Sequence, residues 1–180
     1  MKLGLYIVED DFSLIRRYIA GETACFEELV KRHWKRAISV AYQTIGDYEE
    51  AKDISQEAFT RVLRSISQFR FEASFSTWLS RIVVNLSKNY LQRTKKKFPL
   101  QEEAELEERA TPCNLDDRLQ MADLKDAINS LKEPYRMCII LKDIEGFSYK
   151  ETARILDCPI GTVMSRLNAA RRILRKRLKR

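Results

Sequence analysis

The sequence predicts an all-α protein of two small helical domains joined by a flexible linker, with a helix-turn-helix in the second domain. Apolar residues recur at helical spacing along most of the 180 residues, and alternation typical of a sheet is not sustained. Residues 98–117 carry seven acidic side chains and one basic, between flanks of net charge +5 and +8. An acidic, weakly apolar segment between two basic blocks is typical of a linker, which places the domains at 1–97 and 118–180.

The first domain is predicted to contain four helices, at about 10–20, 24–44, 47–67 and 75–95. Gly21 and the Gly46-Asp47 pair interrupt the apolar pattern. Asp47 is a good N-cap for the third helix, and Ser74 or Ser76 can cap the fourth. The single histidine, His33, is expected to pack beside a buried face. Apolar spacing predicts that the first helix uses Phe12, Leu14, Ile15 and Ile19, and that the third buries Ala51, Ile54, Ala58, Phe59, Val62, Leu63 and Ile66.

The second domain is predicted to contain four more helices. The first spans about 117–131, and the next begins near Pro134, carries apolar residues up to Ile144 and ends at Gly146. The run from Ser148 to Glu151 is a capping box that opens the following helix. The turn Asp157-Cys158 leads into a last helix that begins near Pro159 and that Val163, Leu167, Ala170 and Leu174 hold in place.

Composition excludes several classes of function. A net charge of +7 and a pI near 9.3 favour a polyanionic partner. The four cysteines, Cys113 in the linker among them, are widely spaced, so we expect reduced thiols and no metal site. The N-terminus lacks a long apolar run, and we therefore expect a cytoplasmic protein with no membrane insertion of its own. No phosphate loop, nucleophile elbow or H-E-x-x-H motif is present, so neither catalysis nor a cofactor is expected.

A basic helix-turn-helix is the strongest functional signal. From Cys158 to Arg180 the chain has eight basic residues and no acidic ones. In a helix-turn-helix the second helix enters the major groove of DNA. Hydroxyl and guanidinium groups on such a helix reach phosphates or base edges, and this predicts contacts from Thr162, Ser165, Arg166, Arg171 and Arg172. A solvated basic tail is the simpler alternative.

A second signal is the acid-free stretch from Ala73 to Gln101, with the loop that precedes it. Aromatic rings can stack on unpaired bases while neighbouring cations follow the backbone. Phe69 and Phe71, in the loop, are the better candidates for stacking on bases, because the helical spacing of Phe75 and Trp78 predicts that these two are buried in the core. A purely structural role is equally compatible with these residues. The polar face of the third helix has no function that its residues alone indicate.

Three segments resemble bacterial extracytoplasmic-function (ECF) sigma factors of RNA polymerase, in the family's order. The family's clamp-binding helix of region 2 is similar to DYEEAKDISQEAFTRVLRSISQFR. The segment that melts and reads the promoter −10 element is similar to FSTWLSRIVVNLSKNYLQR. Region 4, which reads the −35 element, is similar to LKEPYRMCIILKDIEGFSYKETARILDCPIGTVMSRLNAARRIL. The resemblance covers nearly the whole chain.

The resemblance implies an alternative sigma factor of stress response and transcription regulation that binds core RNA polymerase, at the β′ clamp and β flap, and promoter DNA. An anti-sigma factor is a further implied partner. The implied polymerase-binding residues are Asp53, Gln56, Glu57, Thr60, Arg61 and Arg64. The residues implied to contact the −10 element are Phe69, Phe71, Ser74, Trp78, Arg81, Asn85, Lys88 and Asn89. Those implied to contact the −35 element are Thr162, Ser165, Arg166, Arg171, Arg172 and Lys176. Met164 and Ala169 stand where the family commonly has basic residues.

Two other classes of protein remain compatible with the sequence. A conventional helix-turn-helix regulator would bind palindromic duplex DNA alone and use its N-terminal domain to dimerise or bind a ligand. An RNA-binding or ribosome-associated helical protein would share the net charge. The stretch from Phe69 to Asn85 favours the sigma factor over the first alternative, since a duplex reader has no need of it.

Overall fold

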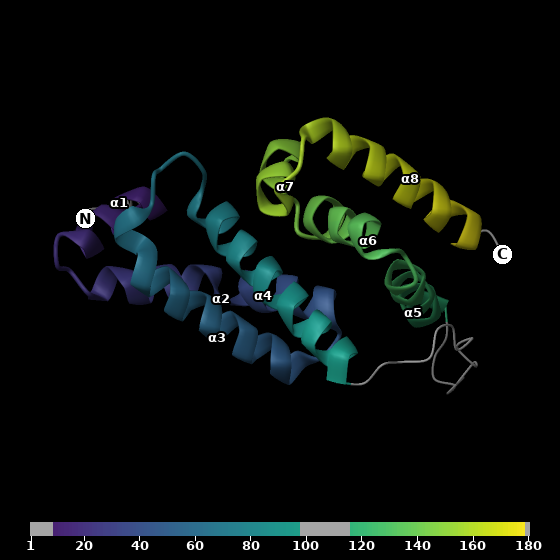
Figure 1. Cartoon of the computed structure of the whole chain (residues 1–180), viewed down its shortest axis with the longest axis horizontal. Helices are drawn as coiled ribbons and strands as arrows, with labels where there is room; N and C mark the ends of the chain where they lie inside the picture. The colour runs from purple at the N-terminus through teal and green to yellow at the C-terminus, as the bar shows by residue number, and fades with distance from the viewer. Residues whose placement is uncertain (1–8, 98–115, 179–180) are drawn as a thin grey trace, which may run out of the picture. The chain divides into compact units, whose positions relative to one another are not determined.

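The computed structural model describes residues 9–97 and 116–178, and within these ranges every regular element is a helix. The predicted all-α class is confirmed. The chain divides into two compact units, Met1–Ser87 and Lys88–Arg180, which are considered separately below (Figure 1). This division falls inside a helix, ahead of the boundary predicted at residue 97. Most of the predicted linker, with Cys113, lies outside the described residues, and Asp116 and Asp117 belong to a helix.

The first unit is a packed set of four helices whose ends follow from local sequence chemistry. Gly46 ends α2 in a left-handed conformation, with φ of 82°. The Asp47 carboxylate accepts a hydrogen bond from the Glu50 amide at 3.1 Å, and the Ser74 hydroxyl accepts one from the Thr77 amide at 3.2 Å. Both predicted caps are therefore confirmed. The elements are α1 (Asp11–Ile19), α2 (Ala24–Ile45), α3 (Tyr48–Ser65), the 3₁₀ turn η1 (Ile66–Gln68) and α4 (Phe75–Lys97).

Two predicted core residues of this unit are on the surface instead. Leu63 is 43% exposed and Ile19 is 48% exposed. Each lies near the end of its helix. The apolar spacing continues to that end, but neighbouring helices do not cover it. The other apolar residues predicted for α3 are buried, and so are Leu14 and Ile15 of α1.

A polar cluster fastens α1 to α2. The imidazole Nε2 of His33 lies 2.7 Å from the Asp11 carboxylate, and the Arg32 guanidinium lies 3.4 Å from the same carboxyl group. The His33 ring also packs against Phe75, with ring centroids 5.0 Å apart. The single histidine therefore packs in the fold, as predicted, and links α1, α2 and the start of α4.

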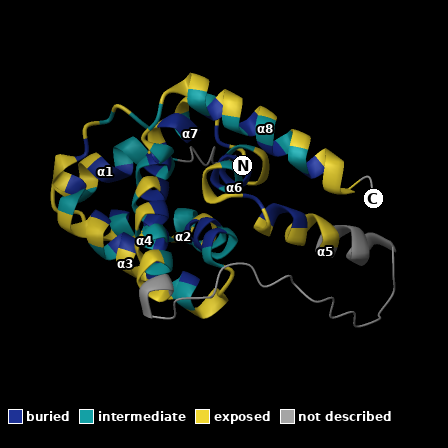
Figure 2. Ribbon diagram, turned by 45° about the vertical axis from the view of Figure 1, so that its right-hand side comes forward, coloured by how far each residue is buried: buried dark blue, intermediate teal, exposed yellow. Residues whose placement is uncertain are grey.

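The second unit builds its core around α8. Figure 2 shows buried and exposed residues alternating along this helix. One apolar cluster joins the end of α5 to the inner faces of α6, α7 and α8, and it includes Val163, Leu167, Ala170 and Leu174, as predicted. The elements are α5 (Asp116–Asn129), α6 (Glu133–Ile139), η2 (Ile140–Ile144), α7 (Tyr149–Leu156) and α8 (Ile160–Leu178).

The helix predicted to run through Ile144 changes character at Ile140. Residues Ile140–Ile144 form a π-helical turn, and Gly146 then ends the segment with φ of 77°. A π turn widens the helix and redirects the side chains that follow. Ile144, predicted as part of an apolar helix face, is accordingly 42% exposed. Apolar spacing alone does not distinguish this turn from a continued α-helix.

Candidate functional site

The helix-turn-helix of the second unit is formed by α7 and α8. The predicted capping box opens α7: the Glu151 amide donates to the Ser148 hydroxyl at 3.2 Å, and the Ser148 amide donates to the Glu151 carboxylate at 2.9 Å. Asp157 ends α7 in the left-handed conformation, with φ of 53°. Asp tolerates this conformation better than most residues. The turn to Ile160 is therefore tight, as a helix-turn-helix requires.

Helix α8 buries one side and presents the other to solvent. Ser165, Arg172 and Lys176 are exposed, and helical periodicity places them on the side opposite Val163, Leu167 and Leu174. Thr162 is half-buried on the edge of this face. These predicted −35 residues are thus available to a ligand in the described structure. Met164, at one of the two departures from the family pattern, is also exposed, and Ala169 is half-buried.

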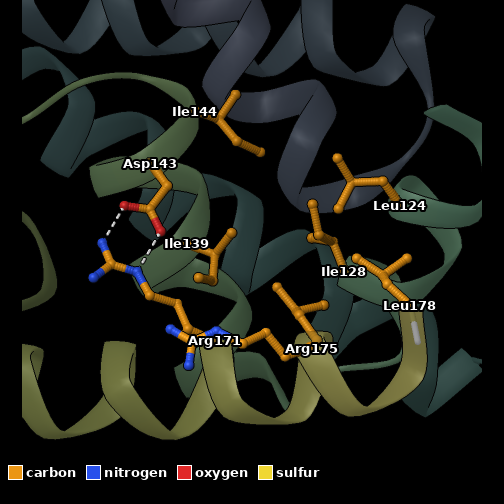
Figure 3. A pocket seen from close by; sticks show the side chains of 9 residues that line it. Leu124, Ile128, Ile139, Asp143, Ile144, Arg171, Arg175 and Leu178 are labelled. Atoms are coloured by element: carbon orange, nitrogen blue, oxygen red, sulfur yellow. Dashed lines mark hydrogen bonds and ion pairs between the residues drawn. The ribbon is translucent and has the colours of Figure 1, made fainter. Parts of the chain in front are cut away.

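Arg171, a predicted −35 contact, is paired with a carboxylate in the described structure. Its guanidinium makes two hydrogen bonds to the Asp143 carboxylate, at 2.6 and 3.0 Å (Figure 3). This hydrogen-bonded contact raises the pKa of Arg171 further above its ordinary value. The side chain is half-buried on the flank of α8 beside η2, because the π turn carries Asp143. In the free chain Arg171 therefore joins α8 to η2 and is already neutralised by a carboxylate.

Arg166, on the other flank of α8, has a different environment. Its guanidinium lies 4.0 Å from the Cys158 sulfur, and no carboxylate pairs with it within residues 9–97 and 116–178. It lines a hollow of about 390 Å³ with Lys132, Tyr135 and Ser165. A half-buried cation beside a second cation and a hydroxyl is suited to bind a phosphate. Arg166 thus remains a candidate DNA contact, and Lys132 and Tyr135 are neighbours that the sequence did not reveal.

Cys138 is close to the same guanidinium but is fully buried. Burial raises the pKa of the Cys138 thiol to about 11. Cys25 and Cys138 are buried and Cys158 is half-buried, and all three are free thiols.

Among the described residues, no group of three or more His, Cys, Asp or Glu side chains is placed to hold a metal ion. In the same part of the chain, no helix is both long and apolar enough to cross a membrane.

An apolar groove lies between α5, η2 and α8, as Figure 3 shows. Its volume is about 470 Å³. Three of its apolar side chains, Leu124, Ile144 and Leu178, are among the exposed large hydrophobic residues of the chain. Arg171 and Arg175 supply cations along α8, and Asp143 faces the first of them. A hollow with exposed aliphatic walls and a cationic border is suited to an amphipathic partner helix.

The polar face of α3 is exposed, as the prediction of a contact surface requires. Asp53, Gln56, Glu57, Arg61 and Arg64 are exposed and Thr60 is half-buried. The Arg61 guanidinium pairs with the Glu57 carboxylate at 2.8 Å, one helical turn apart. Leu63 lies three residues beyond Thr60 and belongs to the same exposed surface. Apolar spacing predicted that Leu63 is in the core, so this apolar residue of the candidate interface was not foreseen.

The loop between η1 and α4 is built on an aromatic cluster. Phe69 contacts Phe12, Phe71 and Trp78, with ring centroids 6.1, 5.0 and 5.0 Å apart. It is only 8% exposed, which corrects the expectation that Phe69 is one of the freer loop aromatics. Its ring is therefore part of the buried aromatic cluster against which the loop packs. Phe71 is half-buried and Ser74 is exposed, so both remain accessible in part.

Helix α4 places its predicted −10 residues on one side. Phe75, Leu79 and Val83 are buried, whereas Arg81, Asn85 and Asn89 are exposed. Trp78 and Lys88 are half-buried, and helical periodicity places both on the side of Arg81 and Asn85. A single row of one indole, two amides and two cations therefore leads away from the aromatic loop. Such a row suits a strand of unpaired bases, which offers ring faces, base edges and phosphates together.

Taken together, these features define a helical protein of two units, the second of which contains a basic helix-turn-helix. The family model of Sigma-70 region 2 matches residues 29–97, and the model of Sigma-70, region 4 matches residues 121–174. The chain is 38% identical over 176 residues to the ECF RNA polymerase sigma-E factor of Escherichia coli (strain K12), covering 89% of this chain and 90% of that one. It is 32% identical over 183 residues to the RNA polymerase sigma-H factor of Pseudomonas aeruginosa, covering 94% of each.

Solved structures agree with this assignment. The structure of CnrH in complex with the cytosolic domain of CnrY matches with a TM-score of 0.70 and 26% identity, over 95% of this chain and 98% of that one. The sigma factor RpoE of Bartonella quintana, in complex with the anti-sigma factor NepR, matches with a TM-score of 0.69 and 25% identity, over 86% and 96%. This chain belongs to the ECF family of RNA polymerase sigma factors. It is an alternative sigma factor, and a conventional helix-turn-helix regulator is not favoured.

The two adjacent arginines of α8 allow a direct test of the α8 geometry. Arg172→Ala should lower the slope of log K against log[salt] for binding of the assembled polymerase to promoter duplex by roughly one phosphate contact. Arg171→Ala should leave that slope unchanged, because its charge is already paired with Asp143. Filter binding or fluorescence anisotropy over a range of salt concentrations measures both. An equal loss of slope for the two variants would show that Arg171 leaves Asp143 to bind DNA.

Proposed function

We propose that this chain binds core RNA polymerase and directs it to promoters by reading a −35 element as duplex and a −10 element as an opened strand. The observation that carries the proposal is the row of Trp78, Arg81, Asn85, Lys88 and Asn89 along α4, next to the loop Phe69–Ser74. A protein that reads only duplex DNA has no use for such a surface. The basic face of α8 supplies the second, duplex-binding site.

Core polymerase is the partner that we assign to two further surfaces. The exposed face of α3, with Gln56, Glu57 and Leu63, is assigned to the β′ clamp. The apolar groove beside Ile144 and Leu178 is assigned to the β flap. Both surfaces combine apolar and charged groups. The α3 face is on a different helix from the −10 row of α4, and the groove is bordered by Arg171, whereas Arg172 is exposed on another side of α8. Binding of polymerase and of DNA can therefore occur together on each unit.

Several further properties accompany this role. The polymerase performs the chemistry, so the chain itself needs no catalytic residue and no cofactor. Its place of action is the cytoplasm, where polymerase and promoters are found. An anti-sigma factor is a fitting regulator, since the solved neighbour RpoE is a sigma factor in complex with the anti-sigma factor NepR. Such a partner would act by covering one or more of the exposed surfaces described above.

Promoter-dependent transcription tests the proposal as a whole. Specific run-off transcripts should appear only when core polymerase and this chain are both present. The chain alone should not shift promoter duplex with high specificity at physiological salt. The control is the same core enzyme without the chain. Identical start sites without the chain would contradict the proposal, and tight specific binding by the chain alone would support a conventional regulator.

Core binding should depend on the two assigned surfaces separately. Substituting Gln56 and Glu57 together by Ala should weaken binding to core polymerase and leave stability within about 0.5 kcal/mol, because both side chains are exposed. Ile144→Asp should weaken binding of an isolated β-flap fragment, because it puts a charge in the apolar groove. Surface plasmon resonance and urea unfolding provide the measurements. Asp123→Ala, a change at an exposed site on α5, is the control, and unchanged binding in either variant removes that assignment.

Asn85 should act after the duplex opens. Asn85→Ala removes an exposed amide that can bond a base edge, so open-complex formation and selectivity at one −10 position should fall. Binding to duplex −35 DNA should stay the same, because α8 is untouched. Permanganate footprinting of unpaired thymines, on templates that differ at single −10 positions, measures both effects. Normal melting with unchanged base preference would remove Asn85 from the proposed site.

A further inference from the structure

Phe71, in the loop proposed to meet opened DNA, has an unusual backbone. Its φ is 57°, in the left-handed region that bulky residues avoid. The other non-glycine residue with positive φ among those described is Asp157, whose type tolerates this conformation. A bulky residue keeps such a conformation only when its surroundings enforce it, and residues of this kind gather at functional sites.

Helix α1 supplies two of the neighbours that enforce it. The Phe12 ring meets the Phe71 ring edge to face, with centroids 5.6 Å apart. The guanidinium carbon of Arg16 lies 5.1 Å from the centroid of the same ring. Phe12 and Arg16 are four residues apart and so lie on one face of α1. Phe69, packed against both Phe12 and Phe71, completes the enclosure from the loop itself.

Helix α1 is itself held in place independently of the loop. The Asp10 carboxylate caps it by accepting a hydrogen bond from the Ser13 amide at 2.7 Å. Asp11 pairs with His33 and Arg32 of α2. Leu14 and Ile15 are buried against the rest of the unit. Because α1 is anchored to α2 by these contacts, it can fix the loop and does not merely follow it.

We propose that α1 is a positioning element for the −10 loop, in which Phe12 and Arg16 hold Phe71 in its left-handed conformation before DNA binds. The loop is then already shaped for a base of the opened strand. Arg16 acts through Phe71 and does not itself contact DNA. This inference rests on the proposed function of the loop Phe69–Ser74, and it adds a role for a helix that carries no predicted site residue.

Arg17 provides a matched control for Arg16. Both arginines are exposed in the last turn of α1, but Arg17 pairs with Glu9 and Glu22, whereas Arg16 lies against the Phe71 ring. Hydrogen exchange of the full-length chain in the absence of DNA is the first measurement. Arg16→Gln should speed exchange of the amides of residues 70–73 by about two- to five-fold, the size of one exposed cation–π contact. Arg17→Gln should leave them unchanged. Equal exchange in the two variants would overturn the proposal.

Binding of a −10 single strand by the assembled polymerase is the second measurement. Arg16→Gln should weaken it by about two- to five-fold with an unchanged salt slope, and Arg16→Lys should restore most of the loss. In a Phe71→Gly background, which removes the ring and accepts positive φ, Arg16→Gln should have no further effect. A salt slope reduced by one contact would overturn the proposal, because Arg16 would then bind a phosphate directly.

A failure of this inference can be told apart from a failure of the proposed function. If Asn85→Ala weakens binding of the −10 strand while Arg16→Gln does not, the positioning role is wrong and the site assignment stands. If neither Asn85→Ala nor Phe71→Ala changes binding of the strand, the assignment of the loop and α4 to the −10 element fails, and the positioning role fails with it.

Discussion

The aromatic cluster of the first unit is the constraint on which the proposed DNA-opening surface depends. Phe71 has a backbone conformation that costs about 1–3 kcal/mol for a residue of its type. Its two ring contacts contribute about 0.5–1.5 kcal/mol each beyond burial, and the Arg16 contact about 0.5–1 kcal/mol. The favourable contacts therefore match or slightly exceed the strain. Because the contact energies and the backbone strain of Phe71 are similar in size, the loop has a defined conformation before DNA binds and can still adjust when a base enters.

The second unit shows why positive charge alone is a poor guide to a DNA contact. Arg171 and Arg172 are adjacent in sequence, but a rotation of about 100° around the helix separates them. The π turn places Asp143 beside Arg171, whereas Arg172 projects into solvent. One arginine thus joins two structural elements and borders an apolar groove, and the other is available to phosphates. The distinction arises from tertiary structure and from the geometry of a single widened turn.

Much of the fold was predictable because its signals are local. The caps of Asp47, Ser74 and Ser148 depend on residues three positions away, and the glycines at helix ends depend only on their own backbone freedom. The exposed faces of α3 and α4 followed from periodicity, although the family resemblance was needed to suggest what they bind. Leu63 and Ile19 were placed incorrectly because periodicity says which side of a helix a residue occupies, but not how far neighbours cover that side. Ile144 was placed incorrectly because periodicity does not reveal the π turn that redirects its side chain.

The aromatic loop was harder to predict for a related reason. Phe69 and Phe71 are two residues apart in a segment without regular structure, so no period assigns either to the core. Their difference arises because Phe12 and Trp78, which are distant in sequence, enclose Phe69 from two sides. The role of α1 could not be foreseen at all, because Arg16 contacts a ring more than fifty positions later in the chain.

The two nucleic-acid surfaces differ in chemistry in a way that suits successive steps of one process. The exposed row of α8 offers Ser165, Arg172 and Lys176, which suit the phosphates and base edges of closed DNA. The row of α4 adds an indole and two amides to its two cations, which suits bases that have left the duplex. A cationic surface can capture DNA in any state, but the groups on α4 gain their partners only when a strand is open. In the proposed function, the second set of groups on α4 therefore favours opening of DNA that the basic face of α8 has already bound.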